Sequence, residues 1–400
     1  MSSLFVGKYK PAIILTLALA VFLASCKPPT TTPGTTTPDP TPDPTPDKSW
    51  VVTTLAGSDA DARTPAGFNY PTGVAVDSSG ILYVADSGNH RILKITISTG
   101  DITVLAGGGN RGGAALGYVN ATGTAARFRF PTSVAVVESG GEVYVYVADH
   151  YNHCIRKIIT SRGNVTTFAG AEPTSAGSGT RGDDNGAGTV ARFNLPYGVA
   201  VDSDGNLYVA DSNNHRIRKI TSGGDVTIFA GIAENPPGKT NTSGFANGPG
   251  KAAQFDYPEG VAVDSSGILY VADYYNHCIR KIITSTGNVT TFAGAEPTSA
   301  GNGTRGDDNG AGTAARFNLP SGVAVDSSGN LYVADSENER IRKITPEGTV
   351  STLAGSTWGH KDATGEAAQF RHPTGVAVDS SGNLYVADAW NHRIRKIEYK

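Results

Sequence analysis

The chain has 400 residues, and its 33 basic and 36 acidic side chains give a formal net charge of −3 at pH 7. No basic patch stands out along it, which argues against a nucleic acid or an anionic membrane surface as its partner. Two of the lysines fall in the first ten residues, inside a leader, so the mature chain is slightly more acidic than this sum.

The first 25 residues have the pattern of an export signal. A basic start is followed by an apolar run, residues 11–25, that is too short to span a bilayer. The run ends in Leu-Ala-Ser-Cys, which resembles a bacterial lipobox. The resemblance implies cleavage before Cys26 and lipidation of that cysteine, and Lys27 after it favours the outer membrane or the cell surface. The alternative is an ordinary secretory signal with a coincidental cysteine.

Residues 26–49 form a Thr/Pro-rich tether. Eight of the 23 residues from 27 to 49 are proline and almost none is apolar, so this segment cannot bury a core. Proline favours extended polyproline II at about 3.1 Å per residue, which would hold a folded body roughly 60–70 Å from the membrane. We therefore expect a disordered stalk, with the N-terminal lipid as the only membrane attachment.

Six copies of one motif fill the rest of the chain. Each is a variant of Pro-x-Gly-Val-Ala-Val-Asp, then Leu-Tyr-Val-Ala-Asp, then Asn-His-Arg-Ile-Arg-Lys-Ile. The copies begin at Pro71, Pro131, Pro196, Pro258, Pro320 and Pro373, so they repeat every 53 to 65 residues. A period of this length with short β-rich runs and Gly turns indicates a propeller or a solenoid. The sequence shows no sustained 3.6-residue periodicity, which excludes helical solenoids.

Each copy predicts four antiparallel strands, the composition of one propeller blade. In the third copy they are residues 198–202, 207–210, 217–221 and 226–230, separated by Gly- and Asp-rich turns. The last copy stops after its third strand, and the missing fourth strand stands at residues 51–57 instead. The sequence therefore predicts an all-β domain over residues 50–400: a six-bladed β-propeller whose N-terminal strand closes the last blade.

The Asn-His-Arg-Ile segments at residues 89–92, 214–217 and 391–394, with their flanking strands, resemble NHL repeats. The resemblance covers all of residues 50–400 and implies a six-bladed NHL propeller, without pointing to an activity. Two copies depart from the pattern. The fifth has Glu339 in place of the histidine, and the second lengthens its first hairpin.

Most of the repeated polar residues are expected to be structural. The motif histidines fall one in each of five blades around the ring, so they cannot converge on one metal ion and should bond turns or neighbouring strands. The aspartate that ends each second strand should accept backbone N–H bonds or pair with a blade arginine. The heads of the Arg and Lys side chains should be solvated. Cys154 and Cys278 lie in blades that are not neighbours, so we expect two buried free thiols.

Positions that differ between the copies are free to serve function. The residues after the opening prolines should surround the central opening, and the pairs before each Asn-His should lie on the same face as the long blade-linking loops. Four aromatic side chains in those pairs would give a surface suited to a protein or glycan. The predicted ligand-binding residues are Thr72, Tyr151, Tyr197, Glu259, Tyr274, Tyr275 and Trp390. The alternative is that these rings are partly buried against the adjacent loops.

An enzyme is disfavoured because residues 149–203 recur almost unchanged at 273–327, whereas catalysis needs distinct groups at one point. We expect no catalytic residues, no cofactor and no metal, but a monomeric envelope lipoprotein that binds a protein or glycan. The alternative is a metal-dependent lyase or hydrolase in the central channel, since related propellers include peptidylglycine lyases and lactonases. Only Glu259 and His372 are candidate ligands there, and a metal site needs three. A purely architectural role is a third possibility.

Overall fold

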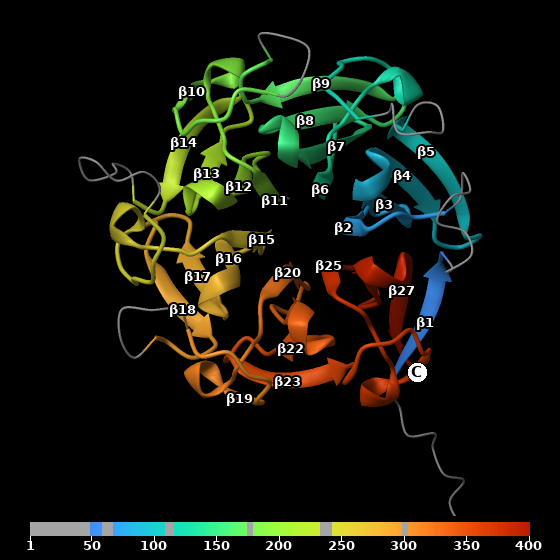
Figure 1. Ribbon diagram of the computed structural model, residues 1–400, viewed down its shortest axis with the longest axis vertical. Coiled ribbons are helices and arrows are strands. Elements are labelled where there is room, and N and C mark those ends of the chain that lie inside the picture. The colour runs from blue at the N-terminus through green and yellow to red at the C-terminus, as the bar shows by residue number, and fades with distance from the viewer. Residues whose placement is uncertain (1–48, 58–66, 109–115, 174–178, 233–241, 298–302) are drawn as a thin grey trace, which may run out of the picture. The chain divides into compact units, whose positions relative to one another are not determined.

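The computed structural model describes residues 49–57, 67–108, 116–173, 179–232, 242–297 and 303–400. They belong to one compact unit, residues 48–400, in which six sheets surround a central axis (Figure 1). The predicted leader, the lipidated Cys26 and all of the tether except Ser49 lie outside the described residues. Within the described ranges, no helix has the length and apolarity needed to cross a membrane.

Each sheet contains the four antiparallel strands that were predicted, and the first of them lies nearest the axis (Figure 1). The first strands are β2 (Pro71–Val76), β6 (Pro131–Ser139), β11 (Pro196–Val201), β15 (Pro258–Val263), β20 (Pro320–Val325) and β25 (Pro373–Val378). The second strands are β3 (Ile81–Asp86), β7 (Glu142–Asp149), β12 (Leu207–Asp211), β16 (Ile268–Asp273), β21 (Leu331–Asp335) and β26 (Leu384–Asp388).

The outer half of each blade consists of the third and fourth strands. The third strands are β4 (Arg91–Thr96), β8 (Cys154–Ile159), β13 (Arg216–Ile220), β17 (Cys278–Ile283), β22 (Arg340–Ile344) and β27 (Arg393–Tyr399). The fourth strands are β5 (Asp101–Gly107), β9 (Asn164–Ala169), β14 (Asp225–Ala230), β18 (Val289–Ala293), β23 (Thr349–Ala354) and, for the sixth blade, β1 (Trp50–Ala56).

The ring closes through β1, as the sequence predicts. This N-terminal strand pairs antiparallel with β27, from Trp50 opposite Tyr399 to Ala56 opposite Ile394. Three blades also gain a two-residue fifth strand that the sequence did not predict: β10 (Gly186–Ala187), β19 (Gly310–Ala311) and β24 (Ala363–Thr364). These short strands come from the blade-linking segments and cover part of an outer edge that would otherwise be unpaired.

Short 3-10 turns follow the second strands and interrupt the linkers. The first group is η1 (Ser87–Asn89), η3 (His150–Asn152), η5 (Ser212–Asn214), η7 (Tyr274–Asn276), η9 (Ser336–Asn338) and η11 (Ala389–Asn391). The linker group is η2 (Gly123–Ala125), η4 (Gly188–Val190), η6 (Gly250–Ala252), η8 (Gly312–Ala314) and η10 (Gly365–Ala367).

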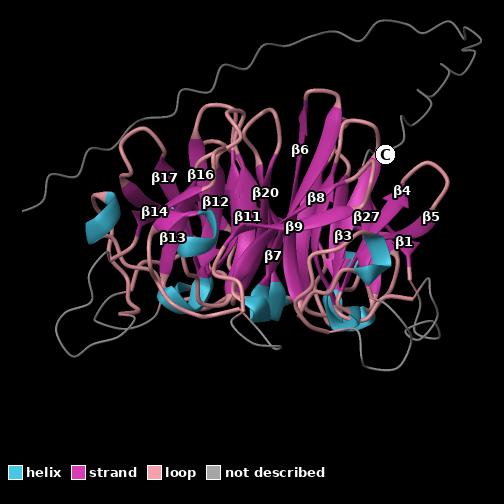
Figure 2. Ribbon diagram, turned by 90° about the horizontal axis from the view of Figure 1, so that it is seen from above, coloured by secondary structure: helices cyan, strands magenta, loops and turns pink. Residues whose placement is uncertain are grey.

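The strand register places four strand ends at one edge of each sheet. In the first blade Pro71 pairs with Asp86, Asp86 with Arg91, and Arg91 with Gly107. The turns after the second strands and the starts of the linkers therefore emerge on the same side of the ring. We call this side the loop face, and most of the short helices lie along it (Figure 2).

The core consists of six clusters, each between two neighbouring blades. Between the first and second blades, Ile92 packs with Val147, Ile158 and Phe128, all fully buried. No cluster belongs to one blade alone, so each blade depends on its neighbours for its apolar burial.

The motif histidine of one blade forms a hydrogen bond with the next blade, which agrees with the prediction that these histidines bond neighbouring segments. The histidine has a left-handed backbone, and its Nδ1 accepts a backbone N–H from the following blade. His153 Nδ1 lies 3.1 Å from Leu195 N, and the other four histidines make the same bond, at 3.0–3.2 Å: His90, His215, His277 and His392. In the fifth blade, Glu339 replaces the histidine and its Oε2 accepts the N–H of His372 at 2.5 Å.

These histidine bonds predict an acid-sensitive ring. Burial, and then the charges of Arg181 and Arg129, lower the pKa of His153 to about 4. The folded protein therefore binds fewer protons than the unfolded chain between about pH 6.5 and 4, so this contribution to stability is lost as the pH falls through that window. We expect His153→Asn to lower Tm at pH 7, and the difference from the wild type to shrink by pH 4.5, in thermal unfolding monitored by circular dichroism.

The control for this experiment is His360→Asn, because His360 is exposed in the last linker. This substitution should change Tm only slightly, and by the same amount at pH 7 and at pH 4.5. An unchanged gap between the wild type and His153→Asn from pH 7 to pH 4.5 would contradict the assignment.

The aspartates at the ends of the second strands are buried bonding centres, which confirms their predicted role. Asp273 Oδ1 accepts the backbone N–H of Asp256 at 2.8 Å, and its Oδ2 accepts Asn276 Nδ2 at 3.0 Å and Arg280 Nη1 at 2.6 Å. Burial raises the pKa of Asp273, and the guanidinium and N–H donors act against that shift. The same arrangement recurs in the second, third, fifth and sixth blades.

The expectation that the arginine heads are solvated is wrong for Arg91, Arg216 and Arg393 at the first arginine position of the motif, and for every arginine at the second position. Arg156, Arg218, Arg280, Arg342 and Arg395 are fully buried. Linker carbonyls close over each guanidinium; Arg280 Nη2, for example, donates to Ala246 O at 2.8 Å. The guanidinium also lies over the ring of the linker phenylalanine, 5.1 Å from that of Phe255. The prediction failed because the acceptors come from a linker that the strand pattern does not place.

Cys154 and Cys278 are free and buried, as predicted. Burial raises the pKa of both thiols well above the usual range. They are therefore structural residues rather than reactive ones.

Candidate functional site

The first strands of the blades approach one another closely at the central axis. A Cβ atom at Gly322 would lie 2.1 Å from the carbonyl oxygen of Thr374 in the next blade, and one at Gly260 would lie 2.2 Å from that of Ser321. Glycine in the Pro-x-Gly segment therefore allows neighbouring backbones to meet, and the residue before it turns toward the axis.

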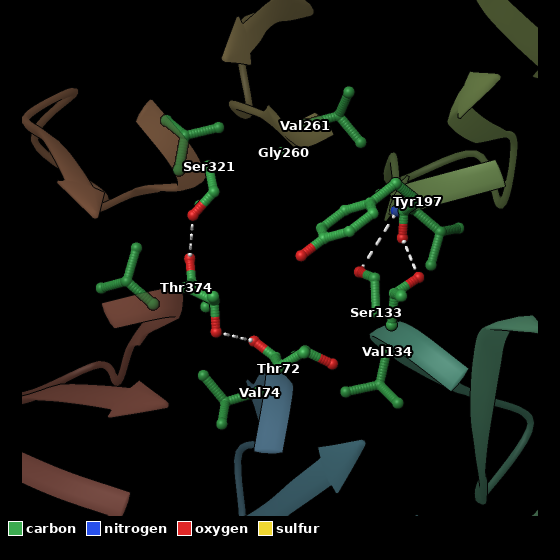
Figure 3. Close-up of a pocket in the computed structure, with 17 residues that line it drawn as sticks. Thr72, Val74, Ser133, Val134, Tyr197, Gly260, Val261, Ser321 and Thr374 are labelled. Carbon is green, nitrogen blue, oxygen red and sulfur yellow. Dashed lines mark hydrogen bonds between the residues drawn. The ribbon is translucent and has the colours of Figure 1, made fainter. Parts of the chain in front are cut away.

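These residues surround a small central cavity of about 80 Å³, whose wall includes Thr72, Thr132, Tyr197, Ser321 and Thr374. The ring of Tyr197 reaches into the opening from β11 (Figure 3). A cavity of roughly 150 Å³ holds a benzene molecule. The channel is thus large enough for water or a small group, and too small for a larger ligand.

Most polar side chains near the axis bond the next blade. Thr132 Oγ1 donates to Tyr197 O at 2.8 Å, and Thr374 Oγ1 donates to Thr72 O at 3.0 Å. Ser212 and Ser336, the first residues of their 3-10 turns, donate to the opening-proline carbonyls of the next blades, Pro258 and Pro373. We call this set of bonds the axial seam. Thr72, one of the predicted ligand-binding residues, is 4% exposed, and its Oγ1 lies 2.5 Å from Ser87 Oγ within the seam.

Glu259 occupies the equivalent place in β15 but behaves differently. It is 6% exposed, is not part of the cavity wall, and makes no hydrogen bond or ion pair with any of the described residues. Burial raises the pKa of this carboxyl well above its usual value. Perturbed carboxyls of this kind are concentrated at functional sites.

The other predicted aromatic residues lie on the loop face around the channel mouth. Tyr151, Tyr275 and Trp390 are 42%, 41% and 45% exposed, while Tyr274 is only partly exposed. Each of these three side chains is therefore partly buried, which agrees with the alternative, and still exposes part of its surface on the loop face. The Trp390 indole N–H also donates to Tyr70 Oη at 2.7 Å, so this bond joins the sixth blade to the first.

The residue before each opening proline was not among the predicted site residues. At all six positions this residue has a left-handed backbone with φ between 50° and 56°: Tyr70, Phe130, Leu195, Tyr257, Leu319 and His372. Large side chains are uncommon in this conformation and often mark function. The signal available in the sequence was the recurrence of bulky residues before a proline.

Several of these side chains extend the exposed aromatic surface. Phe130 lies 5.3 Å from the ring of Tyr151, and Tyr257 lies 5.6 Å from that of Tyr275. His372 stacks on Trp390, with ring centroids 5.5 Å apart. We call the combined set the aromatic rim: Tyr70, Phe130, Tyr151, Tyr257, Tyr275, His372 and Trp390.

The sequence also offered His372 as a metal ligand beside Glu259. The structure places it on the rim and not in the channel wall, with Nε2 3.3 Å from Glu337 Oε1. Burial is the main cause that lowers its pKa. Within the described ranges, no three His, Cys, Asp or Glu side chains come together as a group that could hold a metal ion.

Comparison with known proteins accounts for the repeat. The NHL repeat model matches residues 68–95, 128–158, 193–220, 255–282, 317–344 and 370–397. The chain carries six NHL repeats. They coincide with the first three strands of each blade, and the fourth strand and the linkers fall outside the matched residues.

A protein named for its NHL repeats is similar over most of this chain. NHL repeat-containing protein 2 of Gallus gallus is 30% identical over 367 residues, which cover 84% of this chain and 48% of that protein. The chain thus spans about half the length of this relative.

Two solved structures share the propeller fold. An auxiliary nutrient binding protein of Bacteroides thetaiotaomicron is 17% identical with a TM-score of 0.60, and covers 88% of this chain and 77% of its own. A gluconolactonase of Xanthomonas campestris is 14% identical with a TM-score of 0.52, and covers 87% and 89%. At these identities the likeness shows the fold alone.

Proposed function

We propose that this NHL protein is a lipid-anchored protein of the bacterial envelope, at the outer membrane or cell surface. Its propeller would bind a protein or glycan through the aromatic rim, without catalysing a reaction. The export pattern, the lipobox resemblance and the proline-rich tether support the location. The exposed rings around the channel mouth carry the proposal for binding.

The rim has the properties of a binding surface. Its rings contact one another in pairs, as Phe130 does Tyr151 and His372 does Trp390, and these contacts reduce the side-chain freedom that binding would remove. The rings join a large apolar area to polar edges, which suits contact with either a protein or a sugar. The guanidinium of Arg371 lies 5.3 Å from the Trp390 ring, and that of Arg129 lies 5.8 Å from the Tyr151 ring. These arginines supply hydrogen-bond donors beside the apolar faces.

One observation favours the alternative, a lyase or hydrolase in the channel, and it is the buried carboxyl of Glu259. A general acid or base of raised pKa is a common catalytic device. Among the described residues, however, no second titratable side chain is bonded to Glu259, and Glu259 does not line the cavity. Binding through the rim is therefore the function that the geometry supports best.

The combined variant Tyr151→Ala, Tyr275→Ala, Trp390→Ala tests the rim. A glycan array and affinity capture from solubilised envelope first identify the ligand, and titration of that ligand then gives the dissociation constant. Exposed aromatic anchors dominate binding energy, so we expect affinity to fall at least about 100-fold.

The matched control is Val190→Ala with Ile283→Ala, because both residues are exposed apolar positions outside the rim. This control should leave the affinity within about twofold. If the triple variant is folded, as judged by its unfolding transition, and binds as tightly as the wild type, the rim is not the binding surface.

A further inference from the structure

The fourth blade departs from the axial seam at two positions together. In other blades a hydroxyl or an imidazole near the axis bonds the next blade; Ser321 Oγ, for example, donates to Thr374 O at 3.1 Å, and His150 Nδ1 lies 3.2 Å from Pro196 O. The fourth blade carries Glu259 and Tyr274 at the corresponding positions. Neither side chain forms a seam bond in the described part of the chain.

This departure has a free-energy cost. A carboxylate moved out of water without a partner is destabilising, and it favours any change that supplies a positive charge or a proton. The three blades with threonine at this position show that a neutral residue completes the ring. The fold therefore does not require Glu259.

Strand geometry surrounds Glu259 with tyrosines. Tyr257 stands two residues before it, and Pro258 pairs with Asp273, the residue immediately before Tyr274. From the third blade, a Cβ atom at Gly198 would lie 2.1 Å from the carbonyl oxygen of Glu259, so the strand that carries Tyr197 packs directly against it. The backbone segments that carry Tyr197, Tyr257 and Tyr274 thus flank Glu259.

The electrostatics agree with this placement. Burial, followed by the negative charge of Glu259, raises the pKa of Tyr197, Tyr257 and Tyr274, and for Tyr257 the value is about 12. Glu337 also acts on Tyr274. Burial lowers the pKa of His150, whose ring lies 5.7 Å from that of Tyr197, to about 4, so it is neutral at pH 7. The mouth of the channel at the fourth blade is therefore acidic.

We propose that Glu259, with the rings of Tyr197, Tyr257 and Tyr274, forms a pocket for the organic cation of a ligand, an ammonium or alkylammonium group. An alkylammonium gains from a carboxylate and from aromatic faces at the same time. A calcium ion needs six to eight oxygen ligands, whereas this site offers one carboxylate. This inference rests on the proposed binding function and adds the chemical class that the ligand must present.

Isothermal titration calorimetry on the intact protein at pH 7.5 tests the pocket. The probes are choline, which carries a quaternary ammonium, Nα-acetyl-lysine methylamide, which carries a primary one, and 3,3-dimethylbutan-1-ol, the uncharged isostere of choline. At least one cation should bind with one site per chain, and the uncharged alcohol should bind at least about tenfold more weakly than choline if choline is that cation. Preference between the two cations distinguishes a quaternary headgroup from a lysine side chain as the source.

The isosteric variant Glu259→Gln should weaken binding of the preferred cation at least about tenfold. Its control is Glu347→Gln, which neutralises a fully exposed carboxylate in a hairpin turn and should leave binding unchanged. If Glu259→Gln does not fold, Glu259→Thr replaces it, because threonine stands at this position in three other blades.

Three results would each overturn the inference: no binding of either cation, equal binding of choline and its uncharged isostere, or full binding by Glu259→Gln. Binding of calcium in place of the organic cations, lost in Glu259→Gln, would also overturn it and would favour the channel enzyme. None of these results affects ligand capture by the aromatic rim, so failure of the pocket and failure of the proposed function can be told apart.

Discussion

Replacing Arg280 by leucine should lower Tm by about 4–7 °C, whereas the same change at Arg218 should lower it by less than half as much. Arg280→Leu leaves the buried Asp273 without its cation, and removal of one partner of a buried ion pair costs about 3–5 kcal/mol. In the third blade a second arginine, Arg216, stands two residues before Arg218 and can replace it as the cation that pairs with the buried aspartate. In the fourth blade that position is Cys278.

The first blade shows that an arginine at the first of the two positions can pair with the buried aspartate. Its second arginine position is Leu93, and Asp86 pairs instead with Arg91, whose Nε lies 2.6 Å from Oδ2. The double variant Cys278→Arg, Arg280→Leu reproduces this sequence in the fourth blade and should recover most of the lost Tm. Differential scanning calorimetry on the four proteins makes the comparison. Equal losses in Arg218→Leu and Arg280→Leu, with no recovery in the double variant, would show that the aspartate does not need a cation.

Replacing Glu259 by threonine should stabilise the protein at pH 7, on the order of 2 kcal/mol, which corresponds to roughly 3 °C in Tm. The substitution removes a buried carboxyl that has no partner within the described residues. It also introduces a hydroxyl of the kind that completes the axial seam in other blades, as Thr132 does with Tyr197 O. A residue kept only for stability would give the opposite result.

The pH dependence of this gain follows from the direction of the pKa shift. Burial raises the folded pKa of Glu259 above its ordinary value of 4.5. The unfolded chain therefore releases this proton first, and the destabilisation grows as the pH rises through 4.5 toward the folded pKa. The gain from Glu259→Thr should be larger at pH 7 than at pH 4, where only the contribution of the threonine hydroxyl remains, measured as the difference in Tm between the two proteins. A gain of the same size at both pH values would point to better packing and not to the carboxyl.

The fold and its closure could be predicted from the residues alone. Short-range patterns carry this information: alternation of apolar residues, Gly- and Asp-rich turns, and a repeat that ends one strand early and begins with that strand. Because the repeat is regular, every copy predicts the same four strands. The last copy lacks its fourth strand, and a matching strand stands at the N-terminus, so the pairing of β1 with β27 could be predicted. The structural roles of the aspartates and histidines followed as well, since one residue per blade cannot form a single site.

The different roles of similar residues follow from the packing of the blades and linkers, which the strand pattern does not give. Arg216 and Arg218 lie two positions apart in one strand, yet the second is sealed under linker carbonyls, 2.8 Å from Asp184 O. These acceptors lie 26 to 34 residues away in linkers whose path no strand pattern fixes. The rim residues before the prolines and the isolation of Glu259 likewise depend on how one blade meets the next. Strand periodicity specifies each sheet, but the contacts between sheets are set by packing of particular side chains, and those contacts form the candidate site.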